Sequence, residues 1–241
     1  MRGSKRKKMK TQYFTLALGG CVLLGLSGVG RAEESSAHSF SANVALSSDY
    51  VWRGISQTDS DPAIQGGFDY EHASGFSLGI WGSNVDFGEG DNSDIELDYY
   101  GGFGWQLNDV GFSLGAIYYD YPGESDNDFW EVNAGVSYSY FNAKVSYTDE
   151  FGDGGEEAIY YEAGADFELP VAGGVGLGLH IGYYDIDPAD GENYTDWKIA
   201  LSKSIGGFDF ELAYTDTDIN GSDDPDDLAD GRVIFSLSKS F

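Results

Sequence analysis

Large apolar residues alternate with polar or small residues through most of the chain that follows the N-terminal segment. In residues 94–107, for example, Ile95 and Leu97 share one face of an extended strand, while Glu96 and Asp98 share the other. A period of two is typical of β-strands with one apolar face, and no stretch has the period of 3.6 residues that marks an amphipathic helix. The pattern therefore predicts an all-β protein.

Twelve segments with this alternation are separated by turn-forming residues. They span residues 40–53, 62–72, 75–86, 94–107, 111–121, 128–139, 142–150, 157–168, 174–185, 194–205, 207–216 and 231–241. The connections alternate between short, nearly uncharged turns such as "HASG" and "IGG" and longer acidic ones such as "DFGEGDNSD". In an antiparallel meander, alternate turns lie at opposite ends, so we expect short turns at one end and acidic loops at the other.

This set of features predicts a closed, antiparallel, up-and-down transmembrane β-barrel of about 12 strands. A soluble barrel would need a very large dry core and would expose the Gly- and Ser-rich face to water. A barrel in a membrane instead turns its apolar face to lipid and its polar face to the lumen, and closure leaves no unpaired strand edge.

Aromatic residues stand at the predicted strand ends. Tyr50, Trp52, Trp130 and Trp197 are expected on the apolar face near the acidic loops, and Trp105 and Phe208 near the short turns. Two belts of this kind are typical of the two membrane–water interfaces.

The first 32 residues predict a signal peptide that is removed, which leaves residues 33–241 as the barrel. A basic start, "MRGSKRKKMK", precedes the apolar run "YFTLALGGCVLLGLSGVG" and small residues suited to cleavage after Ala32. An alternative is a lipoprotein signal with acylation of Cys21. Cleavage after Ala32 would leave a chain without cysteine. A signal peptide and a membrane barrel together predict export to the bacterial outer membrane.

The charge is strongly negative, with 41 acidic and 13 basic residues, and 7 of the basic residues lie in the first 32 positions. Such a surface repels the phosphates of nucleic acid, so no nucleic-acid partner is expected. The aromatic content of 15% also argues against a disordered acidic chain.

The sequence "VALSSDYVWRGISQTDSDPAIQGGFDYEHASGFSLGIWGSNVDF" at residues 44–87, followed by "ELDYYGGF", resembles the TorF-type porin family of proteobacteria, first described as a conserved protein of unknown function. The resemblance extends over the chain after the signal peptide and is densest in residues 44–103. It implies an outer-membrane barrel with a role in passive solute uptake, and it supplies no catalytic motif.

The lumen is the first place to look for function. Twelve strands lie between small barrels, which side chains fill, and large barrels with wide aqueous channels. Small inward residues, such as Gly102, Ser137, Gly178, Gly182 and Ser236, favour an open bore. The alternative is that glycine relieves strain in the barrel wall.

Charged residues at inward positions are mostly acidic. They are the carboxylates Asp49, Glu96, Asp98, Glu131, Glu162, Asp166, Glu168, Asp196, Asp209 and Glu211, and the cations Arg53, Lys144, Lys198 and Arg232. A carboxylate-rich pore concentrates cations, since its low-dielectric wall focuses the field, so we predict cation preference. The alternative is that these groups form structural ion pairs.

Two arginines are expected near one mouth of the barrel. Arg53 lies near the outer end of the first predicted strand and Arg232 near the outer end of the last, and these strands are neighbours in a closed barrel. The pair predicts a constriction or a clamp for a carboxylate. The alternative is a structural ladder to acids such as Asp49 along the closing seam.

Metal and catalytic signals are weak. Asp216, Asp218 and Asn220 have the spacing of the first EF-hand ligands, but Asp227 replaces the final Glu and no helices flank the loop. A solvated acidic loop is the alternative, with Ca²⁺ or Mg²⁺ bound loosely near lipopolysaccharide. Among the histidines, His180 is expected to face the lumen, but no nucleophile–base motif accompanies it, so no enzymatic activity and no cofactor are expected.

The chain ends on Phe241, after the alternating strand "GRVIFSLSKSF". A terminal aromatic residue of this kind resembles the signal that the barrel-assembly machinery reads. The sequence as a whole predicts an outer-membrane porin-like channel for passive diffusion of small solutes. The alternative is a binding or structural barrel with a plugged lumen and acidic surface loops.

Overall fold

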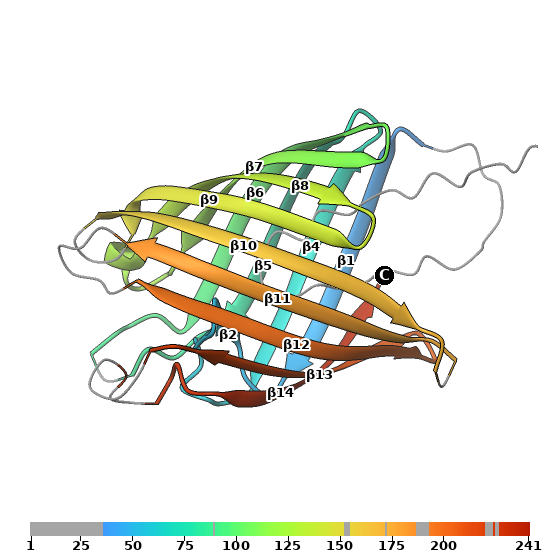
Figure 1. Ribbon diagram of the computed structural model, residues 1–241. Helices are drawn as coiled ribbons and strands as arrows, with labels where there is room; N and C mark the ends of the chain where they lie inside the picture. The colour runs from blue at the N-terminus through green and yellow to red at the C-terminus, as the bar shows by residue number, and fades with distance from the viewer. Residues whose placement is uncertain are drawn as a thin grey trace, which may run out of the picture.

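The computed structural model describes residues 36–88, 90–151, 155–171, 173–186, 193–219, 224 and 227–241. Within this part of the chain, twelve strands form one closed antiparallel barrel (Figure 1). They are β1 (His38–Ser47), β4 (Ala63–His72), β5 (Phe76–Asn84), β6 (Ile95–Leu107), β7 (Val110–Asp120), β8 (Phe129–Tyr138), β9 (Phe141–Phe151), β10 (Glu156–Leu169), β11 (Val175–Ile186), β12 (Tyr194–Ile205), β13 (Phe208–Thr217) and β14 (Arg232–Ser240). The expected signal peptide lies outside the described residues.

The barrel closes where the first and last strands meet. In β1, Leu46 is opposite Leu237 of β14 on one side and Ile64 of β4 on the other. All other wall strands pair with their neighbours in sequence. Closure leaves no strand edge for another chain to pair with. The prediction of a closed twelve-stranded antiparallel barrel is confirmed.

The outer surface of the barrel is apolar. Side chains such as Phe40, Ile64 and Val233 project outward and are about two-thirds exposed, while their neighbours in sequence point into the lumen. Trp130, Trp197, Trp105 and Phe208 are among the exposed aromatics. This inside-out distribution is what a lipid-facing barrel requires, and it follows directly from the alternation in the sequence.

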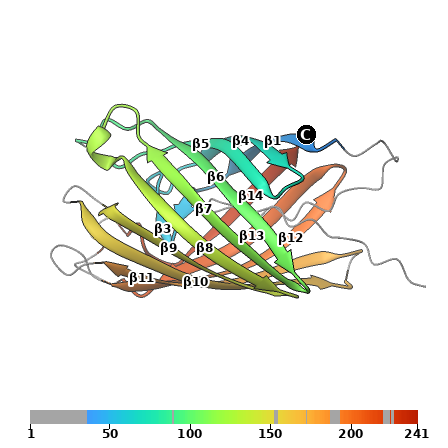
Figure 2. The same cartoon turned by 90° about the horizontal axis from the view of Figure 1, so that it is seen from above.

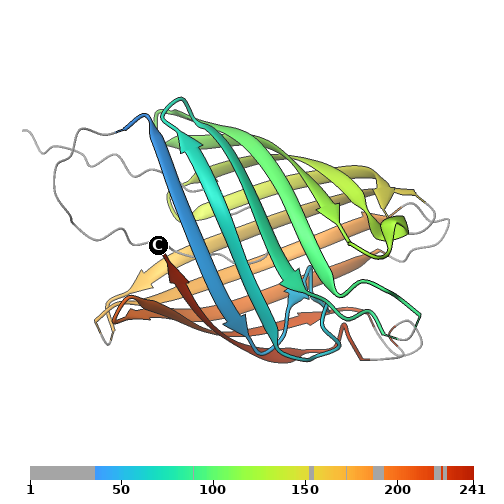
Figure 3. The ribbon, with the colours of Figure 1, turned by 180° about the vertical axis from the view of Figure 1, so that it is seen from behind.

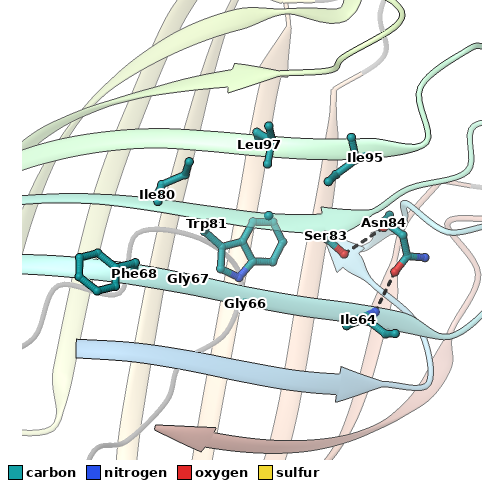
Figure 4. Close-up of a pocket in the computed structure, with 11 residues that line it drawn as sticks. Ile64, Gly66, Gly67, Phe68, Ile80, Trp81, Ser83, Asn84, Ile95 and Leu97 are labelled. Carbon is teal, nitrogen blue, oxygen red and sulfur yellow. Dashed lines mark hydrogen bonds between the residues drawn. The ribbon is translucent and has the colours of Figure 1, made fainter. Parts of the chain in front are cut away.

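One apolar groove interrupts this outer surface (Figure 4). It has a volume of about 390 Å³ and runs between β4, β5 and β6, where Gly66 and Gly82 have no side chains and Phe68, Ile80 and Leu97 form part of the lining. Its lining combines outward side chains with the ring of Trp81, which also packs against Tyr50 in the lumen.

The two ends of the barrel differ as the sequence predicts. Short turns, most of two or three residues, such as residues 73–75 and 206–207, connect the strands at the end where Figure 1 marks the C-terminus. The opposite end, called the outer end below, carries the longer connections, including a single 3₁₀ turn at Ser125–Asn127. Within the described part of the chain, no helix is long and apolar enough to cross a membrane.

One predicted element is wrong. The first wall strand ends at Ser47 rather than at residue 53, and the chain then turns into the barrel. The lumenal loop, defined as residues 48–62, contains a small hairpin of β2 (Val51–Trp52) and β3 (Ile55–Ser56), drawn inside the outline of the barrel in Figures 2 and 3. Apolar and polar residues do alternate through Trp52, but residues 51 and 52 belong to the β2–β3 hairpin and not to the first wall strand.

The turn of this hairpin explains why the chain reverses. Arg53 and Gly54 both have positive φ, at 48° and 86°. A two-residue turn with positive φ at both positions matches the twist of the strands it joins. Tyr50 and Trp52 therefore lie in the lumen, and their predicted place in a lipid-facing aromatic belt is wrong.

Candidate functional site: the lumen and its loop

The tip of the lumenal loop crosses the barrel and packs on the far wall. The ring of Trp52 lies 5.9 Å from that of Tyr119 on β7, 6.3 Å from those of Phe129 on β8 and Phe151 on β9, and 6.0 Å from that of Tyr184 on β11. Tyr119, Phe129 and Tyr184 are buried. Aromatic rings at these separations pack favourably in offset and edge-to-face arrangements. The outer half of the bore is therefore filled.

Arg53 holds the tip through charge and ring contacts. Its guanidinium donates to the Glu131 carboxylate, and both side chains are nearly buried, at 7% and 4% exposed. The same guanidinium lies 4.2 Å from the ring centroids of Trp52 and Tyr160 and 4.7 Å from that of Tyr184. Burial lowers the pKa of Arg53, but the combined effect of Glu131, Tyr184 and Tyr119 raises the pKa well above the ordinary value. Arg53 is thus a permanent cation in an aromatic cage.

The base of the loop is fixed to the closing seam. Asp49 accepts hydrogen bonds from Ser56 (2.7 Å) and Thr58 (3.1 Å), and it forms a salt bridge with Arg232 of β14 at 2.8 Å. Arg232 also donates to Ser60 at 3.0 Å. The Arg232–Asp49 pair is thus the contact expected if Arg232 has a structural role along the closing seam. The loop carries Arg53 away from this seam, so the two arginines do not flank one opening.

Two carboxyl groups of β6 lie under the loop. The hydroxyl of Tyr50 donates to Glu96 at 2.9 Å, and Glu96 and Asp98 are almost completely buried. Burial, and then the negative charge of Glu96 and Asp98, raise the pKa of the Tyr50 hydroxyl well above its usual value. Tyr50 therefore stays protonated and remains a hydrogen-bond donor to this acidic pair.

The inner half of the lumen has a different character. Lys144 pairs with Glu162 at 2.7 Å, and Lys198 pairs with Glu211 at 3.6 Å. These four side chains are 20–26% exposed, against 7% or less for the Arg53–Glu131 pair. Water therefore reaches the inner half of the lumen. We call this half the vestibule.

The boundary between vestibule and filled half is a hydrogen-bonded cluster. Tyr160 donates to Asp196 at 2.7 Å, and Nε2 of His180 lies 3.0 Å from both groups. Asp196 is buried, while the His180 side chain is about a quarter exposed. Nearby, Asp166 accepts a hydrogen bond from Asn142 at 3.4 Å. Tyr160 thus contacts the vestibule through its hydroxyl and Arg53 through its ring.

The interpretation of the small inward residues as an open bore is wrong for the outer half. A Cβ on Gly182 would lie 2.0 Å from the Tyr160 hydroxyl, and a Cβ on Gly79 would lie 2.3 Å from the Tyr100 ring. Glycine at these positions makes room for a neighbouring aromatic side chain. The sequence signal for this filling is the run of tyrosines at inward positions near the outer strand ends.

The possible metal ligands predicted from the sequence form hydrogen bonds with nearby residues. Asp216 accepts from Tyr214 and from the Thr217 N–H, and Asp218 accepts from the Thr195 N–H. Asn220 lies outside the described residues. Among the residues that the structure describes, no group of three His, Cys, Asp or Glu side chains could hold a metal ion.

Phe241 lies at the closing seam. Its backbone exchanges hydrogen bonds with Ala42, at 2.9 and 3.3 Å, and its side chain is exposed on the outer surface. The last residue therefore helps to join the C-terminal end of the chain to β1.

A family model described as "Bacterial protein of unknown function (Gcw_chp)" matches residues 31–241. No curated protein matches the chain. Among solved structures, the NanC porin has a TM-score of 0.52 at 7% identity, covering 83% of this chain and 98% of that one. A protein from a study of in-meso crystallization of membrane proteins has a TM-score of 0.50 at 10% identity, covering 84% and 83%. At such identities the likeness concerns the fold alone.

Proposed function

Because the chain belongs to the Gcw_chp family of bacterial proteins of unknown function, we propose its function from the barrel itself. It is a porin-like channel of the bacterial outer membrane for passive diffusion of small solutes, and the lumenal loop closes its outer half. The observation that carries this proposal is the contrast within the lumen. The vestibule is charged and accessible to water, and what closes it toward the outer end is the lumenal loop, not side chains of the wall strands alone.

Location in the outer membrane is supported by the apolar outer face and by the exposed aromatics at both ends of the strands. The partners that this location implies are membrane lipid, lipopolysaccharide and the barrel-assembly machinery, which would read the strand that ends at Phe241. We propose a signal peptide in residues 1–32, and we propose that the TorF-type porins and this family are the same group. No catalytic activity and no tightly bound cofactor belong to this proposal, and the acidic outer loops would hold Ca²⁺ or Mg²⁺ loosely.

Cation preference follows from the lumenal charges. The cations Arg53, Lys144, Lys198 and Arg232 each pair with one carboxylate. Among the residues that the structure describes, the inward carboxylates Asp166 and Asp209 of the inner half form no salt bridge with Lys or Arg. The excess negative charge in a low-dielectric wall would attract cations and repel anions.

A second candidate is a binding or structural barrel whose lumen never opens. The dense ring contacts of Trp52 favour it, because they fill the outer half of the bore. The two candidates differ in one respect that can be measured. A channel passes ions when the loop is displaced or shortened, and a permanently plugged barrel does not.

Planar-bilayer recording under a KCl gradient tests the proposal. We expect a reversal potential that favours K⁺, and a shift toward zero when Glu162 and Glu211 are both replaced by Gln. Asp126→Asn, in the outer 3₁₀ turn, is the matched control and should leave the potential unchanged. Currents that favour Cl⁻ would contradict cation preference. No current even from a barrel with a shortened loop would establish the second candidate instead.

A further inference from the structure

The cage around Arg53 is built mainly by the barrel wall. Glu131 comes from β8, Tyr160 from β10 and Tyr184 from β11, whereas the lumenal loop adds only Trp52. A carboxylate beside two aromatic faces is suited to a planar guanidinium, which combines charge-assisted hydrogen bonds with stacking. The wall therefore presents the elements of a guanidinium site whether or not the loop supplies the guanidinium.

The wall around this cage also carries polar atoms that the loop leaves without partners. Paired positions form one row across five strands: Asn133, Ser146, Tyr160, Tyr184 and Tyr194. Asn133 Oδ1, Ser146 Oγ and Tyr194 Oη are buried without a hydrogen bond. Buried polar atoms normally have a partner, and leaving them unpaired destabilises the closed arrangement. These atoms would gain partners from a hydrated polar ligand.

The site also has a route to water. The hydroxyl of Tyr160 contacts Asp196 and His180 at the edge of the vestibule, while its ring contacts the guanidinium of Arg53. A solute in the vestibule is therefore separated from the cage only by the side chain of Tyr160.

We propose that Glu131, Tyr160 and Tyr184 form a binding site for solutes that carry a guanidinium group, and that Arg53 occupies this site when the loop is closed. This inference deepens the proposed channel function and rests on it, since it names the solute class that would release the loop. Arg53 is tethered, so its effective concentration is on the order of millimolar, and a free solute must compete at comparable concentrations. Removing Arg53 removes this competitor.

Calorimetric titration of the folded barrel in detergent tests the site, with L-arginine as the probe. L-citrulline is the control probe, because it has nearly the same shape but an uncharged ureido group. We expect Arg53→Ala to bind arginine about tenfold or more tightly than the unmodified protein, since the competing side chain is gone. Citrulline should show no such gain. Adding Glu131→Gln to Arg53→Ala should abolish arginine binding, and heat-modifiable gel mobility would show that each variant is folded.

Equal binding of arginine and citrulline by Arg53→Ala, or no binding of either, would overturn the proposal. The result is separable from the channel function, which is tested by current. A barrel that binds arginine but passes no ions with a shortened loop keeps the site and loses the channel. A barrel that conducts but does not distinguish the two probes keeps the channel and loses the site.

Discussion

The Arg53 contacts should control how long the lumenal loop stays closed. Arg53→Ala leaves the buried Glu131 carboxylate without its cation, and breaking a buried pair in this way costs about 3–5 kcal/mol. Two ring contacts with the wall, to Tyr160 at 4.2 Å and to Tyr184 at 4.7 Å, are also lost, each worth about 0.5–2 kcal/mol and not independent of the ion pair. A loss of about 3–5 kcal/mol lowers the closed-to-open ratio of the loop by roughly 10²- to 10⁴-fold.

Single-channel recording measures this ratio as the open probability. Lys198→Ala is the matched control, because it also removes a lumenal cation. Its pair with Glu211 spans 3.6 Å, with both side chains about a quarter exposed, and such pairs contribute about 0–1 kcal/mol. We expect frequent openings for Arg53→Ala and near-normal behaviour for Lys198→Ala. An open probability for Arg53→Ala that matches that of the unmodified channel would refute the assignment of Arg53 as the residue that holds the loop.

Three further predictions follow from single contacts. Gly54→Ala should also raise the open probability, since the new Cβ would lie 2.4 Å from Thr217; Gly88→Ala has nearly the same φ but open space around it, and should have no effect in the same recording. Asp49→Asn weakens the salt bridge to the seam, so limited proteolysis should cut the loop faster than in the unmodified barrel. Deletion of Phe241 should lower the amount of folded barrel in the membrane, measured by heat-modifiable mobility, more than it changes the conductance of the barrels that do assemble.

The barrel could be predicted from the sequence because one rule repeats in every strand. A wall strand places alternate side chains in lipid and lumen, so the facing of Ile95 and Glu96 follows from their parity. The short turns and acidic loops then set the two ends. Each strand is a weak signal, but closure requires all of them to agree.

The lumenal loop could not be predicted, because parity does not show where the wall ends. The alternation through Tyr50 and Trp52 continues that of β1, yet it belongs to a hairpin that turns at Arg53 and Gly54. The pairing of Arg53 with Glu131 joins residues 78 positions apart. Only the three-dimensional path of the loop brings them together. The one local signal for the turn is Gly54, because glycine readily adopts the positive φ that such a turn needs.

The most direct test of a channel closed by its own loop is the ion conductance of a barrel in which residues 51–57 are replaced by a short Gly-Ser link. A deletion of similar length, residues 122–127 in another outer connection, is the control. We predict a large, steady K⁺ conductance for the first variant, and for the control the low conductance of the unmodified protein. Equal conductance in all three proteins would contradict the account, because the loop would then not be what closes the lumen.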